Sequence, residues 1–151
     1  MIEINNLTTN QIDEEFLRKV AKIVLEEEEK ESNLSIALVG QGRMRKLNKK
    51  YLRKNRVTDV LAFPESKALL EKFKVGPLRK FPGLGEIIIC LREVKKNAKK
   101  YNSTFKKELA RVLIHGNLHL SGYNHEKNKK ETEKMREREN YYLSKINFYG
   151  I

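Results

Sequence analysis

Apolar positions along the chain change period several times, and each change marks an expected element. Short apolar runs at residues 34–39 and 85–90 predict strands, residues 2–4 can start another, and residues 59–63 form one that stops at Pro64. The run at 85–90 is apolar and β-branched on both faces, so we expect it at the centre of a sheet.

Longer stretches with apolar residues three or four positions apart predict helices. One runs from about Ile12 to about Lys30, and another, rich in Lys and Arg, follows the strand at 34–39. A third begins near Ser103, whose hydroxyl is placed as its N-cap. Its second half is apolar on nearly the whole circumference, which predicts a buried helix. A fourth closes the chain after Asn128, with three core positions: Met135, Tyr142 and Ile146.

Together these elements predict one α+β domain over residues 1–151, a small mixed β-sheet packed with helices around a buried central helix. A length of 151 residues suits a single core and leaves no room for a second domain of ordinary size. The segment from Glu65 to Pro82 has two prolines and no clear period. We expect a loop over the functional site, or a short helix within such a loop.

Charge and cysteine content narrow the class of protein. The chain has 32 Lys and Arg against 20 Asp and Glu, a net charge of +12 and a sequence pI near 9.8. That excess attracts polyanions and favours a nucleic-acid partner. No apolar run reaches the roughly 18 residues of a membrane span, and a signal-peptide core is absent, so we expect a cytoplasmic protein. Cys90 is the single cysteine, which excludes an internal disulfide and fits a buried thiol.

The positive charge is concentrated between Arg43 and Arg56, where eight Lys and Arg fall within fourteen residues. Such a run is often only the solvated face of a helix, and Met44, Leu47 and Tyr51 mark the buried stripe that the helix needs. We nevertheless expect part of the run to contact phosphates. The predicted RNA-binding residues are Arg45, Lys46, Lys49, Lys50, Lys54 and Arg56.

The candidate chemistry lies in one eleven-residue stretch that holds all three histidines of the chain, His115, His119 and His125. His115 and His119 are four positions apart, so they share one helix face. His125 reaches the same ion only if the chain turns back after His119, and Gly122 stands where a left-handed residue is needed. Three neutral imidazoles favour zinc, although nickel, copper or iron also suit them. The open fourth position favours catalysis over a structural role.

The residue after the first histidine separates two kinds of hydrolase. Zinc peptidases with the pattern His-Glu-x-x-His-x-x-Gly-x-x-His use the glutamate as general base, and Gly116 takes its place here. A peptidase without that base is the less favoured alternative. The same metal chemistry serves phosphodiester cleavage, which agrees with the positive charge of the chain.

The residues around the histidines resemble those of the YbeY-type endoribonucleases, also described as rRNA maturation factors. Residues 115–125 read His-Gly-Asn-Leu-His-Leu-Ser-Gly-Tyr-Asn-His and are similar to the family's His-Gly-x-Leu-His-Leu-x-Gly-Tyr-Asp-His. Asn124 stands where the family has aspartate. Residues 58–64, Thr-Asp-Val-Leu-Ala-Phe-Pro, and 84–89, Leu-Gly-Glu-Ile-Ile-Ile, are similar to two further family segments. The resemblance covers most of the chain from Leu47 onward.

The resemblance implies a zinc-dependent endoribonuclease specific for single-stranded RNA, which acts in 3′-end maturation of small-subunit (16S) rRNA and in ribosome quality control. It implies one zinc per chain, held by His115, His119 and His125. The implied partners are single-stranded RNA, small-subunit rRNA and pre-ribosomal particles. Arg53 is the candidate catalytic arginine, one position later than the family's arginine.

Two questions stay open at this point. Either water or the 2′-hydroxyl of the RNA is the nucleophile. The second question is whether the chain is an enzyme at all, because a metal-containing ribosome assembly factor with negligible nuclease activity would have the same basic charge and the same histidines.

Overall fold

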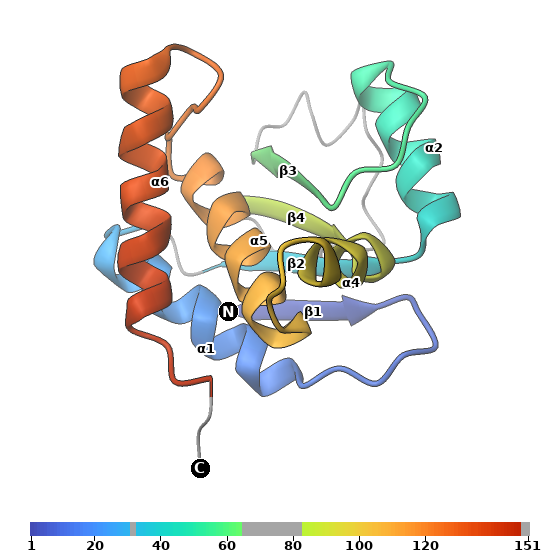
Figure 1. Ribbon diagram of the computed structural model, residues 1–151, viewed down its shortest axis with the longest axis horizontal. Coiled ribbons are helices and arrows are strands. Elements are labelled where there is room, and N and C mark those ends of the chain that lie inside the picture. The colour runs from blue at the N-terminus through green and yellow to red at the C-terminus, as the bar shows by residue number, and fades with distance from the viewer. Residues whose placement is uncertain (31–32, 65–82, 149–151) are drawn as a thin grey trace.

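The computed structural model describes residues 1–30, 33–64 and 83–148, which form four strands and five helices (Figure 1). The segment predicted as a loop, 65–82, lies outside the described residues. None of the described helices combines the length and the hydropathy needed to cross a membrane. In chain order the elements are β1 (Ile2–Asn6), α1 (Glu14–Glu27), β2 (Leu34–Val39), α2 (Gln41–Leu52), β3 (Val60–Pro64), β4 (Gly85–Cys90), α4 (Leu91–Lys100), α5 (Phe105–Leu120) and α6 (Lys129–Ser144).

The strands form one mixed sheet in the order β1-β2-β4-β3. β1, β2 and β4 are parallel, and Leu34 of β2 lies beside Gly85 of β4. β3 runs antiparallel to β4, with Val60 beside Ile89. The strands predicted at 34–39 and 85–90 are confirmed, and β4 has the central place expected for it. The mixed sheet with its helices confirms the predicted α+β class.

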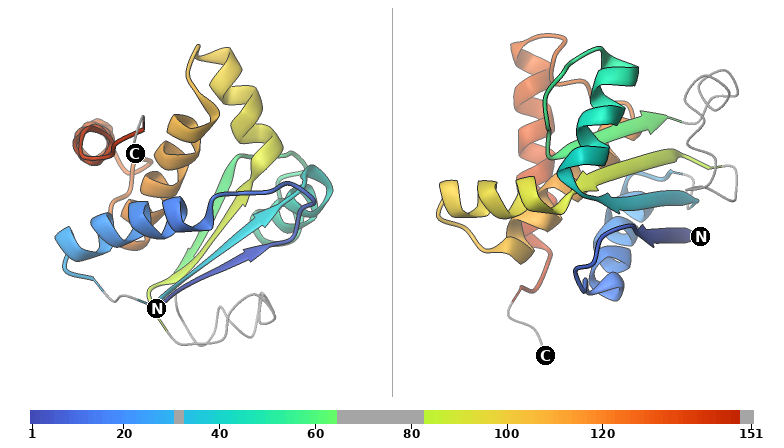
Figure 2. Two further views of the ribbon diagram at one scale, coloured as in Figure 1. Left: turned by 90° about the horizontal axis from the view of Figure 1, so that it is seen from below. Right: turned by 90° about the vertical axis from the view of Figure 1, so that its right-hand side faces the viewer.

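Helices cover both faces of this sheet, with α1 and α5 on one side and α2 on the other (Figure 2). Side chains alternate along each strand, and Ile87 and Ile89 accordingly pack into the core with α1 and α5. Ile88 points the other way and packs with Met44 of α2 and with Cys90. Burial on both faces explains why β4 is apolar throughout, and it confirms Cys90 as a buried thiol.

α5 is the buried central helix that the sequence predicts, and it contacts α1, α4, α6, β3 and β4. Its N-cap is Thr104, whose side chain accepts a hydrogen bond from the Lys107 amide at 3.1 Å. The prediction of Ser103 as N-cap is therefore wrong by one residue. The Ser103 amide donates to the Ala98 carbonyl at 2.8 Å, so Ser103 completes the turn that ends α4.

A glycine lets α5 lie close to the sheet. A Cβ added at Gly116 would stand 3.0 Å from Cγ2 of Ile87 in β4. Real Cβ atoms rarely come so near a neighbour, so a larger residue would push the helix and strand apart. The position of Gly116 therefore faces the core.

α1 ends at Glu27, three residues before the predicted end at Lys30. Glu29 adopts a left-handed φ of +55°, its amide donates to the Glu26 carbonyl, and the Lys30 amide donates to the Leu25 carbonyl at 3.0 Å. These two bonds define a Schellman motif. The usual sequence signal for this motif is glycine, and its absence here explains the error.

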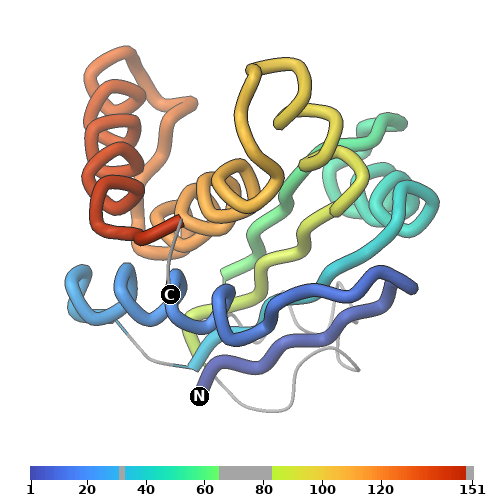
Figure 3. The backbone as a smooth tube through the Cα atoms, turned by 60° about the horizontal axis from the view of Figure 1, so that its bottom comes forward, coloured from blue at the N-terminus to red at the C-terminus, as the bar shows by residue number. Residues whose placement is uncertain are grey.

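α6 lies beside α5 (Figure 3). It begins after Asn128, whose side chain accepts from the Glu131 amide at 2.8 Å. Met135 and Tyr142 are buried, as predicted for the closing helix. Ile146 follows the end of the helix and packs, partly buried, against the same core.

Candidate functional site

The three histidines lie together at the C-terminal end of α5 and in the turn that follows. Their ring centroids are 6.0 Å apart for His115 and His119, 5.0 Å for His115 and His125, and 5.5 Å for His119 and His125. The chain reverses at Gly122, which has a φ of +110° and whose amide donates to the His119 carbonyl at 3.2 Å. The predicted reversal after His119 is confirmed. We call these three residues the histidine cluster.

In two of the rings the Nδ1 atom has a protein partner. Oε1 of Glu139, on α6, lies 2.5 Å from Nδ1 of His115. The carbonyl oxygen of Tyr123 lies 3.1 Å from Nδ1 of His119. A carbonyl oxygen only accepts, so the neutral His119 ring donates from Nδ1 and keeps a lone pair on Nε2. A carboxylate on Nδ1 orients His115 in the same sense, an arrangement typical of metal-ligating histidines.

The third ring has an unpaired nitrogen. Nδ1 of His125 is buried and has no hydrogen-bond partner among the described residues, whereas its Nε2 lies 3.9 Å from Oε1 of Glu126. Burial of the ring lowers the pKa of His125, and the charges of His115 and His119 lower it further. The ring is therefore neutral near pH 7 and has a nitrogen available, as metal ligation requires.

The chemistry of the donor set fits zinc, which takes imidazole nitrogens at about 2 Å. Among the residues described, however, no three His, Cys, Asp or Glu side chains are already arranged as a ligand group. The proximity of the rings is the stronger observation, because rotation about the side-chain bonds can redirect the nitrogens without moving the backbone. His125 is half-buried and its Nδ1 has no described partner, so its ring can turn toward an ion while Glu139 and the Tyr123 carbonyl hold His115 and His119.

A cavity of about 560 Å³ opens beside the histidine cluster. All three histidines line it, together with the five residues of β3 from 60 to 64. Two cationic side chains, Lys54 and Arg56, line the same cavity. We call it the histidine cavity. It brings a candidate metal site and positive charge to one place.

The structure places the other predicted site residues outside the lining of this cavity. Arg53 is exposed at the C-cap of α2, in a left-handed conformation with a φ of +55°. Leu52, at the position of the family's arginine, lines the cavity instead. Lys46 and Lys50 line a separate groove along α2, and Arg45 and Lys49 are exposed on that helix.

Asn48 holds the segment that carries the cavity's cations, residues 53–56, which we call the cationic turn. Its Nδ2 donates to the Arg56 carbonyl at 3.0 Å, and the Lys54 amide donates to the Asn48 carbonyl at 3.3 Å. Asn48 is 1% exposed and its Oδ1 is buried without a described hydrogen-bond partner. Sequence reasoning missed this residue, because an amide within a basic helix has the pattern of a solvated face.

Carboxylates near the histidines were also missed. Asp59 lines the cavity and accepts from Nδ2 of Asn97 at 3.3 Å, and Glu126 lines it from the turn after α5. Glu139 is 24 positions from His115 in the sequence, so no local spacing signals their contact. Arg111, one turn before His115 on α5, pairs with the buried Glu108.

Asn124 makes a local hydrogen bond. Its Oδ1 accepts from the Glu126 amide at 3.0 Å, and the residue is exposed. An aspartate would accept the same bond. The departure from the family's aspartate therefore preserves the shape of the turn that carries His125.

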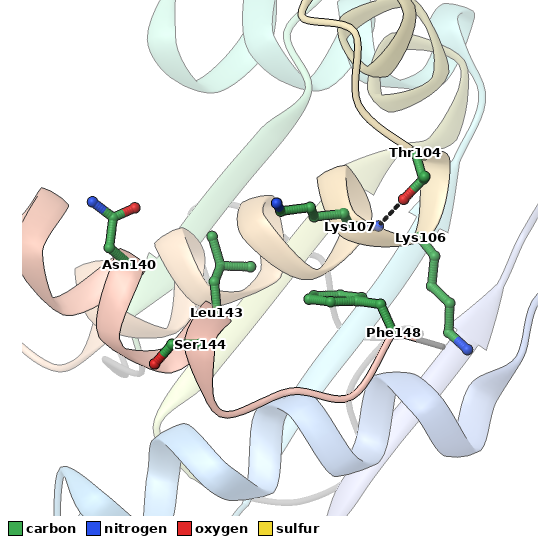
Figure 4. A pocket seen from close by; sticks show the side chains of 7 residues that line it. All are labelled: Thr104, Lys106, Lys107, Asn140, Leu143, Ser144 and Phe148. Atoms are coloured by element: carbon green, nitrogen blue, oxygen red, sulfur yellow. Dashed lines mark hydrogen bonds between the residues drawn. The ribbon is translucent and has the colours of Figure 1, made fainter. Parts of the chain in front are cut away.

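A second cavity of about 550 Å³ lies between the N-terminal end of α5 and the C-terminal part of α6 (Figure 4). Leu143 and Phe148 face Thr104 and Lys107 across it, and the Phe148 ring centroid is 6.2 Å from that of Phe16 in α1. Among the described residues, its lining includes cations but neither histidine nor carboxylate. The histidine cavity is therefore the stronger candidate for chemistry.

Fold and cavity together define a class of protein. It is a small α+β domain in which the central helix carries a histidine pair at i and i+4, a glycine turn returns a third histidine, and cations line the same cavity.

Comparison with known proteins gives the family within that class. The family model described as "Endoribonuclease YbeY" matches residues 3–147, and the chain belongs to this family. A protein of Thermodesulfovibrio yellowstonii named endoribonuclease YbeY is 47% identical over 75% of this chain and 66% of its own length. A protein of Thermosipho melanesiensis with the same name is 34% identical over 96% of this chain and 97% of its own.

A solved structure agrees with the fold. The solution structure of TM1509 from Thermotoga maritima matches with a TM-score of 0.63 and 28% identity, and the match covers 100% of this chain and 99% of that one.

Proposed function

We propose that this protein is a zinc-dependent endoribonuclease that cleaves single-stranded RNA in the histidine cavity. The observation that carries the proposal is the meeting of three histidines with Lys54 and Arg56 in one cavity. Membership of the YbeY family supports RNA as the substrate. The net charge of +12 supports a polyanionic substrate independently.

The histidine cluster would hold the ion through Nε2 of His115, Nε2 of His119 and a ring nitrogen of His125. Bound zinc supplies a Lewis acid that polarises a phosphate oxygen and activates water near neutral pH. Glu139 holds the His115 ring by its Nδ1, and the Tyr123 carbonyl holds His119 in the same way. Both contacts orient the rings and maintain their basicity toward a metal.

Lys54 and Arg56 are the cations that we assign to the phosphate, because they line the histidine cavity. They neutralise charge on the scissile group and on the RNA backbone. The catalytic role of Arg53 stays a prediction of the family resemblance. Arg53 lies at the C-cap of α2, so its contribution to RNA cleavage can be compared with that of Arg56. Arg45, Lys46, Lys49 and Lys50 would bind RNA outside the cavity, along α2.

Asp59 is our candidate for moving a proton in the reaction. It lines the cavity, and hydrogen bonds from Asn97 at 3.3 Å and from Thr58 at 3.4 Å hold its carboxylate. If water is the nucleophile, Asp59 would accept its proton, and the product would end in a free phosphate. If the 2′-hydroxyl attacks, the product would carry a cyclic phosphate. Analysis of the RNA ends separates the two routes.

The cellular role follows the family resemblance. We propose action on small-subunit rRNA at its 3′ end, on pre-ribosomal particles, and in ribosome quality control, in the cytoplasm. A ribosome assembly factor with a structural zinc is the second candidate, since it would use the same basic surface. A peptidase is disfavoured by Gly116, because its side-chain position faces Ile87 and is closed to the glutamate that such enzymes need.

The test combines metal content with cleavage of a single-stranded RNA oligomer, using native protein, chelated and reloaded protein, and His119→Ala. The proposal predicts about one zinc per chain. Chelation or His119→Ala should abolish cleavage, and added zinc should restore cleavage by the chelated native protein. Far-UV circular dichroism checks that the variant folds. Zinc without cleavage would favour the assembly factor, and chelator-sensitive casein digestion would favour the peptidase.

A further inference from the structure

One carboxylate joins three separate parts of the chain near the histidine cluster. Glu28, the C-cap of α1, accepts hydrogen bonds from Nη2 of Arg138 at 2.6 Å, from the hydroxyl of Tyr123 at 3.1 Å and from the hydroxyl of Tyr142. We call these four residues the Glu28 cluster. The side chain of Glu28 is 9% exposed, so its charge depends on these partners.

The Glu28 cluster is strongly coupled electrostatically. Burial raises the pKa of Glu28, but hydrogen bonds from Tyr142, Arg138 and Tyr123 outweigh it and lower the pKa overall. The hydrogen bond to Glu28 in turn raises the pKa of Arg138. Glu28 and Arg138 are therefore charged at neutral pH, and the cluster is an anchored ion pair with two phenols.

Tyr123 connects this cluster to the histidines. Its hydroxyl bonds Glu28, and its carbonyl meets Nδ1 of His119 at 3.1 Å. Its amide donates to the Leu118 carbonyl at 3.1 Å, and His125 follows two positions later. Tyr123 therefore links α1 to the orientation of the His119 ring and to the turn that brings His125 back to the cluster.

Two further contacts of the histidine cluster come from α6. Glu139 holds the His115 ring, and the Thr132 hydroxyl donates to the His125 carbonyl. Arg138, the neighbour of Glu139 on α6, reaches Glu28. The Tyr123 contact is thus the point at which α1 acts on the same cluster.

We propose that Glu28 is a positioning residue for the histidine cluster and acts through Tyr123. This inference rests on the proposed function, because it concerns the same metal site. Ligands held in place before binding lose little freedom when the ion arrives, so loss of the anchor weakens the metal complex. Glu28 and Tyr123 are 95 positions apart in the sequence, so no local motif signals their contact.

The experiment uses Tyr123→Phe, which removes the hydroxyl that meets Glu28 and leaves the ring. The matched control is Tyr141→Phe, since the Tyr141 hydroxyl donates to Oε1 of Glu27 at 2.5 Å and also joins α6 to α1, outside the Glu28 cluster. Zinc affinity is measured by competition with a chelator, and the thermal midpoint of each metal-free variant is recorded. We expect zinc binding about tenfold weaker in Tyr123→Phe, in the range seen for lost outer-shell partners.

Tyr141→Phe should bind zinc like native protein while showing a similar small change in thermal midpoint. Equal zinc affinity in Tyr123→Phe and native protein would overturn the proposal. An equal loss in Tyr141→Phe would also overturn it, because the effect would then be general stability.

A second readout needs no metal. In NMR spectra of the metal-free protein, the His119 ring should be in the Nδ1–H tautomer in native protein and Tyr141→Phe, and should average between tautomers in Tyr123→Phe. Unchanged His119 signals in Tyr123→Phe would contradict the positioning role. If native protein bound no zinc, the proposed function would fail, and these spectra would still decide the role of Glu28.

Discussion

The two sides of the histidine cavity are held very differently. On the histidine side, Glu139, the Tyr123 carbonyl and Thr132 each contact one member of the histidine cluster. On the cationic side, Lys54 and Arg56 are exposed, and the hydrogen bonds described for their turn involve backbone atoms and the Asn48 side chain.

This difference matches the two tasks that the proposed function would require. Metal ligation demands fixed nitrogens, because zinc accepts a narrow range of distances and a tetrahedral geometry. Phosphate neutralisation tolerates movement, since charge acts over several ångströms and an RNA strand takes many conformations. The cavity therefore combines an ordered histidine side with an adaptable cationic side.

The largest effect is expected from loosening the ordered side. Glu139→Gln removes the charge that bonds Nδ1 of His115 and keeps the size of the side chain. Zinc binding should weaken by roughly 10- to 100-fold, measured by chelator competition. Glu137→Gln makes the same charge change at an exposed position of α6 and should bind zinc like native protein. Equal affinities in both variants would contradict the role of Glu139.

The adaptable side should respond through charge. Arg56→Ala is expected to lower RNA affinity and to reduce the slope of log affinity against log salt by about 0.7, the value for one lost contact to single-stranded phosphate. Zinc affinity should stay unchanged. Arg53→Ala tests the alternative that Arg53, the candidate from the family resemblance, contacts the RNA in place of Arg56. Lys19→Ala, at an exposed position of α1, is the charge-matched control. A larger loss in Arg53→Ala than in Arg56→Ala would reverse the assignment.

Acid should lower the folding stability that the ionised Glu28 side chain provides on the ordered side. The pKa of Glu28 is lower in the folded protein than its ordinary value, so its ionised form stabilises the fold above the unfolded pKa. That stability is lost as pH falls through the folded value. Urea unfolding of metal-free protein should show a steeper loss below about pH 4.5 in native protein than in Glu28→Gln.

The control for this acid effect is Glu26→Gln, at an exposed position of α1. It should keep the native pH dependence. An identical acid profile in Glu28→Gln and native protein would show that the Glu28 cluster adds no stability through its charge.

The smallest effect is expected at Asn124. Asn124→Asp keeps the acceptor that bonds the Glu126 amide, so the turn should keep its shape. Zinc affinity and RNA cleavage should both stay within a few-fold of native protein. A large gain in cleavage would show that the family's carboxylate has a chemical role which asparagine lacks.

Local patterns predicted the parts of this molecule that local physics determines. β2 and β4 match their apolar runs to the residue, and Gly122 has the positive φ that the histidine spacing requires. The error at Ser103 arises because the next residue, Thr104, is also a preferred N-cap. The error at Lys30 arises because Glu29 takes the left-handed position that glycine usually occupies.

The candidate site was predicted only in part, because its supporting contacts are long-range. Glu139 meets His115 across 24 positions and Glu28 meets Tyr123 across 95, and neither spacing follows a helix or strand period. Asn48 was hidden by its basic neighbours, although it fixes the turn that carries Arg56. Sequence patterns named the candidate ligands, and the tertiary fold supplies the contacts that orient their rings.

The central claim is that the three histidines bind one zinc ion between them. Its most direct test is a crystal structure of zinc-loaded protein with anomalous diffraction measured at the zinc edge. The account predicts a single strong peak per chain, about 2 Å from Nε2 of His115, Nε2 of His119 and a ring nitrogen of His125. A peak elsewhere, or a histidine cluster without a peak in protein that carries zinc, would contradict it.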